Sequence, residues 1–229
     1  MDNVGTARVK EAEAHSDMPM PVVLLTGFGA FPGAPSNPSA GIIRLLAGAP
    51  TARLARLGIR LERHVLPVVF AAAPQRLAIL IESLRPSAVL HIGLAGRRRS
   101  LCVETRACNF VSQLHPDARR QTPVSRSITP GGVPARAARV PSQRLVHALR
   151  AAGARSQISI DAGSYVCNQT LYLTLGTETA LAGFIHVPRP RGRRPPGMSK
   201  MPPPPTLAGM ARAVEAALIV LATELRRNR

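Results

Sequence analysis

Cys167 is the residue of this sequence best placed for nucleophilic chemistry. It lies in the segment 161–168 (DAGSYVCN), between a short apolar run and a segment with helical spacing. At the start of a helix, the dipole and the unpaired N–H groups lower the pKa of a cysteine and favour its thiolate. The alternative is a small buried hydrophobic side chain, which is the commoner fate of a free cysteine.

Two further residues could complete a site with Cys167. His186 stands near the end of the apolar run 183–187, and the carboxyl ends of strands in an open α/β sheet face the binding crevice. It is either catalytic or a solvated residue at the sheet edge. Glu104 interrupts a mostly apolar stretch in a chain with few acidic residues, and it is either functional or merely exposed. Together the three supply a nucleophile, a base and an orienting carboxylate.

Strands that alternate with helices must carry these residues. Apolar runs, some closed by glycine, predict strands at 22–26, 59–69, 88–93, 101–110, 158–160 and 184–187. Helical spacing predicts helices at 40–46, 75–84, 143–151, 168–175 and 207–227. This alternation is typical of an α/β fold around a mostly parallel sheet.

The length and composition favour one folded domain. The 229 residues are 45% hydrophobic, which is enough to bury a core, and only 3% aromatic, so that core must be mostly aliphatic. Residues 1–19 are expected to form a flexible N-terminal extension, and 20–229 a single domain. A basic, proline-rich loop is expected at 189–205.

The charge balance is strongly basic. Thirty Lys and Arg against twelve Asp and Glu give a formal net charge of +18, as a nucleic-acid-binding protein can have. Only Lys10 and Lys200 are lysines, however, and the arginines are scattered along the chain. This pattern favours compositional bias of the coding sequence, so binding of nucleic acid is expected to be at most non-specific.

Cysteine usage and hydropathy indicate the compartment. Three cysteines, an odd number, fit a reducing cytoplasm better than a disulfide framework, and their spacing is no zinc motif. Cys102 and Cys108 are expected to be core residues. The first residues lack the apolar segment of a signal peptide, and no apolar stretch reaches the ~18–20 residues of a membrane span. A cytoplasmic protein is therefore expected.

Four segments, in order along the chain, resemble the pyroglutamyl-peptidase I (pyrrolidone-carboxylate peptidase) family of cysteine peptidases. Residues 24–39 (LLTGFGAFPGAPSNPS) are similar to the family's first strand and its GF-x-x-F-x-x-x-x-x-NPS loop. Residues 162–168 (AGSYVCN) resemble the AGT-[FY]-VCN nucleophile motif, and 183–188 (GFIHVP) the catalytic-histidine motif. A weaker likeness covers 93–109 (GLAGRRRSLCVETRACN), where the family has G-[QI]-AGGR and then E-R-x-A-x-N.

The resemblance implies an activity and a catalytic role for three residues. Cys167 would be the nucleophile, His186 the general base and then acid, and Glu104 the third catalytic residue. The implied reaction is hydrolysis of an N-terminal pyroglutamyl residue from a peptide through an acyl-enzyme. The implied fold is a three-layer α/β/α sandwich, without cofactor or metal, in a homo-oligomer.

The resemblance also implies a pocket for the pyroglutamyl ring. Its substrate-binding residues would be Phe28, Phe31, Asn37, Tyr165 and Val166. A pyroglutamyl lactam has no free amine, so a flat neutral ring is held by aromatic faces and backbone hydrogen bonds. Without the resemblance, the two phenylalanines read as core anchors beneath a Gly/Pro loop.

Two departures from the family pattern put the rate and specificity in question. Leu114 stands where the family has an arginine that helps the oxyanion site, and Leu94 where many members have glutamine. The alternative function is therefore a catalytically weakened relative that acts as a basic binding module for an acidic partner or nucleic acid. His115, Arg119 or Arg120 could replace the missing donor.

Overall fold

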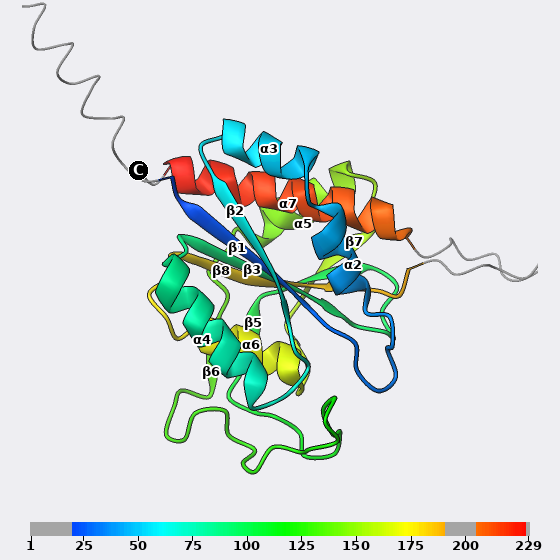
Figure 1. Ribbon diagram of the computed structural model, residues 1–229, viewed down its shortest axis with the longest axis vertical. Coiled ribbons are helices and arrows are strands. Elements are labelled where there is room, and N and C mark those ends of the chain that lie inside the picture. Colours follow the sequence, from blue (N-terminus) through cyan, green and yellow to red (C-terminus); the bar gives the residue numbers. More distant parts are fainter. Residues whose placement is uncertain (1–19, 191–204, 228–229) are drawn as a thin grey trace, which may run out of the picture.

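A six-stranded sheet forms the centre of the computed structural model, which describes residues 20–190 and 205–227 (Figure 1). In spatial order its strands are β2 (Arg60–Leu66), β1 (Val22–Phe28), β3 (Ala88–Leu94), β8 (Leu181–Val187), β4 (Leu101–Glu104) and β7 (Ser156–Ser159). The first four run parallel, while β4 is antiparallel to β8 and parallel to β7. The expected mostly parallel sheet is confirmed.

Helices cover both faces of this sheet (Figure 1). One face carries α2 (Pro38–Leu45), α3 (Ala49–Arg56), α5 (Ser142–Ala151) and α7 (Leu207–Arg227). The other carries α4 (Ala72–Leu84), α6 (Val166–Thr174) and a small ribbon of β5 (Arg106–Cys108) and β6 (Ala135–Ala137). The three-layer α/β/α sandwich is therefore confirmed.

Strand alternation decides which residues face which helical layer. Successive side chains of a strand point to opposite faces, and every residue of β1 is buried because both faces are covered. In β8, Ile185 and Val187 belong to the core beneath α7, and Phe184 belongs to the core beneath α6. His186 therefore shares the α6 face with Phe184. By the same alternation Val103 faces α7, and Glu104 faces α6.

Several element boundaries differ from the sequence expectation. Helix α4 begins at Ala72, so Pro74 lies in its first turn, where the missing N–H has no partner to lose. Helix α6 begins at Val166, two residues earlier than expected. The stretch 101–110 is divided between β4 and β5, which lie in different sheets. Helix α3 was not expected, because Leu54 is its one fully buried large apolar side chain and gives no periodicity.

Some expectations fall outside the described residues. The flexible extension 1–19 and residues 191–204 of the expected basic loop are among these. In the part of the chain that is described, no helix has both the length and the hydropathy needed to cross a membrane.

Candidate active site

A buried carboxylate and an imidazole form the centre of the candidate site. Glu104 at the end of β4 pairs with Phe184, and Cys102 pairs with His186, so Glu104 and His186 are diagonal neighbours on one face. Glu104 has no exposed surface, and its Oε1 lies 2.7 Å from His186 Nδ1. A carboxylate can only accept, so Nδ1 carries the proton and Nε2 is left as a base.

Cys167, the second residue of α6, comes close to this pair because β3 offers no side chain there. A Cβ at Gly93 would lie 2.9 Å from Cys167 Sγ and 2.7 Å from a carbon of the Phe184 ring. Gly93 is the register partner of His186 on the neighbouring strand, about 5 Å away. The sulfur therefore lies over the sheet beside the imidazole, although no hydrogen bond joins these two described residues. Catalytic hydrogen bonds often tighten only when substrate binds.

The protonation state of Cys167 differs from the sequence expectation. Burial, followed by the negative charge of Glu104, raises the pKa of the thiol to about 12, and the backbone N–H of Cys167 lowers it only in part. The expected thiolate-favouring shift is thus wrong, because desolvation outweighs the helix terminus. The resting residue is a thiol, and a base must remove its proton.

Aromatic rings lie on the same side of the sheet as Cys167. Phe28 is buried and stacks on Phe184 with ring centroids 6.2 Å apart, so it is a core anchor. Phe31 and Tyr165 are half-buried, and their rings lie 6.2 Å apart at a tilt. Phe70 meets Tyr165 edge-on at 5.1 Å and was missed by sequence reasoning. Its only sequence signal is the scarcity of phenylalanine.

Asn37 and Val166, the other two residues expected in the substrate pocket, have structural roles. Asn37 is buried and caps α2: its Oδ1 accepts from Ser39 N at 3.1 Å, and its Nδ2 donates to Gly29 O at 2.9 Å. This fixes the loop that carries Phe31. Val166 is fully buried as the first residue of α6, directly before Cys167.

Donors for a developing negative charge are present at the start of α6. No side chain caps this helix at Tyr165, so the N–H groups of its first turn keep their hydrogen-bonding capacity. Leu114 is 83% exposed and provides no donor of its own.

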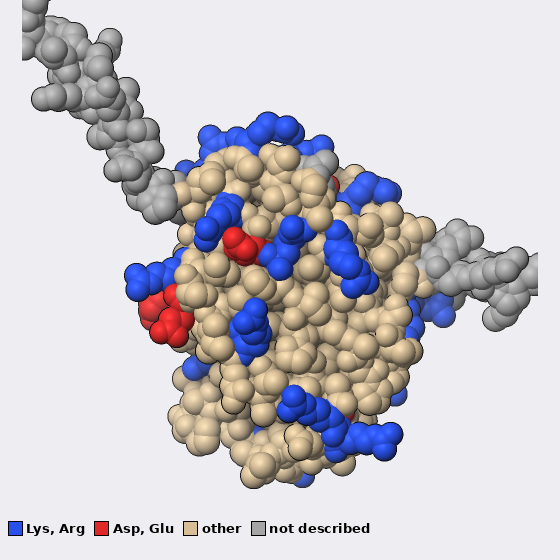
Figure 2. All heavy atoms as spheres, viewed as in Figure 1, with Lys and Arg blue, Asp and Glu red and all other residues tan. Residues whose placement is uncertain are grey.

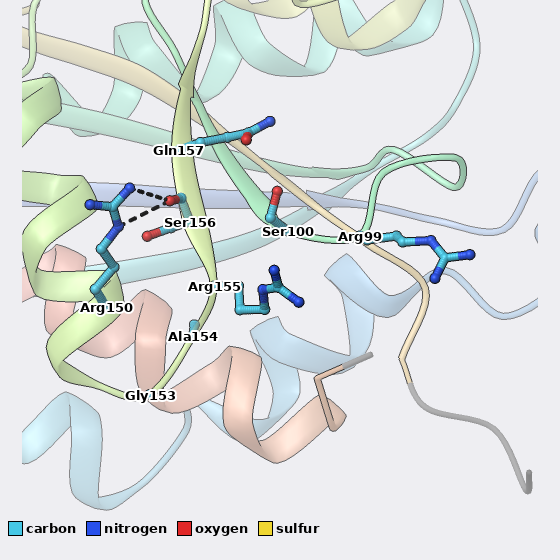
Figure 3. A pocket seen from close by; sticks show the side chains of 8 residues that line it. All are labelled: Arg99, Ser100, Arg150, Gly153, Ala154, Arg155, Ser156 and Gln157. Atoms are coloured by element: carbon cyan, nitrogen blue, oxygen red, sulfur yellow. Dashed lines mark hydrogen bonds between the residues drawn. The ribbon is translucent and has the colours of Figure 1, made fainter. Parts of the chain in front are cut away.

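One cavity of the described residues lies away from these side chains. It has a volume of about 570 Å³ at the amino ends of β4 and β7, and its lining contains none of the candidate residues (Figure 3). Two of the Arg150 N–H groups donate to Ser156 O there. Among the described residues, no three His, Cys, Asp or Glu side chains gather as metal ligands would.

Thiol hydrolases are the class to which this fold and site point, because a cysteine nucleophile needs a neighbouring base that a third group orients. The model of the pyroglutamyl peptidase family matches residues 21–224, and the chain belongs to that family. Among curated relatives, the pyrrolidone-carboxylate peptidase of Gloeobacter violaceus is 38% identical over 208 residues, which are 88% of this chain and 97% of the relative. The pyrrolidone-carboxylate peptidase 1 of Ralstonia nicotianae is 34% identical over 209 residues, covering 87% and 94%.

Solved structures agree with this assignment. The pyrrolidone carboxyl peptidase from Thermococcus litoralis has a TM-score of 0.78 at 28% identity, covering 92% of this chain and 97% of its own. The pyrrolidone carboxyl peptidase from Thermus thermophilus has a TM-score of 0.73 at 34% identity, covering 86% and 99%. The family identified by resemblance is thus confirmed.

Proposed function

We propose that this protein is a cysteine exopeptidase that hydrolyses the bond after an N-terminal pyroglutamyl residue. Cys167 acts as nucleophile, His186 as general base and then acid, and Glu104 orients the imidazole. The observation that carries this proposal is the buried Glu104–His186 pair beside the thiol that lies over Gly93. Family membership and the names of the relatives support the same activity.

Acylation follows from the protonation states. His186 Nε2 takes the thiol proton of Cys167 as Sγ bonds to the scissile carbonyl carbon, and the carbonyl oxygen becomes an oxyanion. The N–H groups in the first turn of α6 are the donors that stabilise this negative charge in the proposed mechanism. The tetrahedral intermediate then collapses: the C–N bond breaks, and the imidazolium gives its proton to the leaving amine.

Deacylation uses the same groups in reverse order. His186 removes a proton from water as its oxygen bonds to the thioester carbon. The C–S bond then breaks, the imidazolium returns its proton to Cys167, and pyroglutamate leaves. Throughout, the hydrogen bond from Nδ1 to Glu104 keeps the tautomer that leaves Nε2 available, and it stabilises the transient imidazolium.

Specificity is proposed to come from the aromatic side of the site. Phe31 and Tyr165 are the half-buried rings, so their faces are the ones available to a flat lactam ring. Three further residues contribute by fixing the elements that carry these rings and the thiol. The loop that carries Phe31 is fixed by Phe28 and Asn37, and the start of α6 is fixed by Val166.

The test is a comparison of three fluorogenic arylamides, with pyroglutamyl, prolyl and glutaminyl groups. We expect the pyroglutamyl substrate alone to be turned over, and Cys167→Ser to lower kcat by about 10³-fold or more. Cys108→Ser, a substitution of another half-buried free cysteine, is the matched control and should leave kcat within about twofold. Equal turnover of the prolyl substrate, or full activity of Cys167→Ser, contradicts the proposal.

The proposed setting follows the same reasoning. The three cysteines are unpaired in the structure, so we propose the cytoplasm as the compartment. A homo-oligomer is proposed as the assembly on the family resemblance alone. The alternative of a weakened relative that acts as a basic binding module gains no support from the relatives, whose names are those of peptidases.

A further inference from the structure

Both partners of Glu104 meet it at a single oxygen. Arg98 Nη1 donates to Oε1 at 2.5 Å, and His186 Nδ1 donates to the same oxygen at 2.7 Å. Oε2 is buried and has no hydrogen-bond partner among the described residues. The orientation of this carboxylate therefore depends on how the two donors share one oxygen.

The burial of Glu104 makes the charge of Arg98 important. A carboxylate with no exposed surface is strongly destabilised as an anion unless a cation pairs with it. His186 is neutral while it acts as a base, so it cannot supply that charge at the start of the reaction. Arg98 is the only described cation that forms a salt bridge with Glu104 besides His186. It places a positive charge beside the carboxylate oxygen that accepts from Nδ1.

The second nitrogen of the same guanidinium reaches the segment that carries the nucleophile. Arg98 Nη2 donates to Asp161 O at 2.6 Å. Asp161 opens the turn that leads to α6, and its Oδ1 accepts from the N–H of Gly163, whose φ is +80°. A planar fork with several donors can bridge a carboxylate and a carbonyl at once, whereas a lysine ammonium presents a point charge.

We propose that Arg98 is a positioning residue of the active site, which holds Glu104 as an oriented anion and ties β4 to the loop before Cys167. The inference rests on the proposed function, because it concerns the same site. It adds a fourth member that acts through Glu104 and the 161–165 loop and never touches the substrate.

Arg97 provides a matched control. It is the adjacent arginine and is exposed, and its side chain has no hydrogen bond or ion pair within the described residues. Arg97→Met and Arg98→Met remove the same charge and leave a similar apolar stem. Arg98→Lys keeps a cation but loses the fork, so it separates the effect of charge from the effect of positioning.

The first measurement is kcat and KM for the pyroglutamyl arylamide between pH 5 and pH 9, the range around the ordinary histidine pKa. Arg98→Met should lower kcat by about 10–100-fold, the range found when a hydrogen-bond partner that orients a metal-binding side chain is removed. KM should change less than kcat, and the acid limb of the profile should move to higher pH. Arg98→Lys should have the acid limb of the wild-type pH profile but only part of the wild-type kcat. Arg97→Met should match the wild type in both.

A double-mutant cycle with Glu104→Gln tests whether Arg98 acts through Glu104. Once the carboxylate is gone, Arg98→Met should cost much less than it does in the wild-type background. An equal cost in both backgrounds, or a kcat of Arg98→Met within about twofold of wild type, overturns the proposal. If Arg98→Met does not fold, Arg98→Lys decides: full wild-type kcat with an unmoved pH profile overturns it.

A readout without turnover separates this inference from the proposed function. The proton on His186 Nδ1 should give a far-downfield NMR resonance, assigned by its loss in Glu104→Gln. We expect Arg98→Met to shift or broaden that resonance and Arg97→Met to leave it in place. If the wild type does not cleave the pyroglutamyl substrate, the proposed function fails, while this resonance still decides whether Arg98 positions the pair.

Discussion

At Cys167 two opposing effects act on one thiol. The N-terminal position in α6 favours the thiolate, whereas burial and the nearby Glu104 favour the protonated form, and together they raise the pKa to about 12. Such a site resembles a serine hydrolase more than a preformed thiolate–imidazolium pair. The base His186 must then work in every turnover, which agrees with its firm attachment to Glu104.

We therefore predict that free Cys167 shows no thiolate near neutral pH. The difference in ultraviolet absorbance between the wild type and Cys167→Ser, followed as pH rises, should show no thiolate signal through about pH 9, since ionisation is centred well above an ordinary cysteine pKa of about 8.5. A difference signal already complete at pH 7 contradicts the prediction and indicates a preformed ion pair.

The side chain of Leu114 is the basis of a second prediction. Its side chain cannot donate a hydrogen bond and is exposed to solvent, at the position where the sequence resemblance implies an arginine. Leu114→Arg should raise kcat toward pyroglutamyl arylamide, up to the roughly 10²–10³-fold that one oxyanion donor contributes. Leu114→Met controls for bulk and should change nothing.

An unchanged kcat in Leu114→Arg means that the donors are already complete. In that case the variants His115→Ala, Arg119→Ala and Arg120→Ala show whether one of these residues supplies the donor. Replacing the residue that compensates should lower kcat by about tenfold, which is about 1.4 kcal/mol. If none of the three variants has a lower kcat, the N–H groups of α6 are sufficient to stabilise the oxyanion.

Among the elements, α6 is held to the sheet by His91. This fully buried side chain of β3 lies 2.6 Å from Thr26 Oγ1 of β1 and 2.8 Å from Thr174 Oγ1 at the end of α6. Burial lowers its pKa to about 3, so it is neutral in the folded protein. His91 thus fixes the far end of the helix that presents Cys167 at its start.

This arrangement predicts a stability that depends on pH. The folded pKa of His91 is about 3 and the unfolded one about 6.5, so the contribution is fully present above pH 6.5 and is lost as pH falls toward 3. The loss amounts to roughly 5 kcal/mol at about 1.4 kcal/mol per pH unit. Urea unfolding between pH 7 and pH 3.5 should show it.

His91→Asn is the control for that titration. It cannot be protonated, so its free energy of unfolding should fall less steeply over the same pH range, although it is less stable at pH 7 because the imidazole bridge is lost. Parallel slopes for the two proteins would mean that other groups cause the acid loss.

At the level of the whole molecule, basic residues far outnumber acidic ones, with thirty Lys and Arg against twelve Asp and Glu. Figure 2 shows basic side chains scattered over one face, with few acidic ones between them. Near the site, Arg106 donates to Ile160 O and Arg189 to Gly33 O, so these guanidinium groups bond neutral carbonyls and keep their positive potential. Potential of one sign around a cleft attracts ligands of the opposite sign.

Peptides with acidic residues after the pyroglutamyl group should therefore bind better. We expect KM for a pyroglutamyl-Asp peptide to be about fivefold lower than for its Lys counterpart, as roughly 1 kcal/mol from exposed charges implies. The preference should shrink at about 0.5 M salt, where the Debye length is only a few ångströms. Arg106→Gln and Arg189→Gln should weaken it. A preference unaffected by salt contradicts the electrostatic cause.

The same charge predicts weak binding of nucleic acid. Affinity should be independent of sequence and should fall steeply with salt in a fluorescence anisotropy titration. A sub-micromolar complex with one DNA or RNA sequence that persists at about 0.2 M salt would instead favour the binding-module alternative.

The sequence by itself determined most of the alternation of strands and helices, and it supplied the candidate residues of the site. Local periodicity sets the elements, and short motifs such as AGSYVCN and GFIHVP carry Cys167 and His186 within a few neighbouring residues. Both are properties of contiguous chain, so they can be read without knowing what lies opposite. The class of fold and the family followed from them.

Only the tertiary structure decided the chemistry of those residues. Glu104 and His186 are 82 positions apart, and the reversal of β4 against β8 makes them neighbours. The same packing places Cys167 over Gly93, where dehydration raises the thiol pKa, and brings Arg98 to Glu104. Burial and long-range contacts fix protonation and orientation, because both depend on which groups replace water around a side chain.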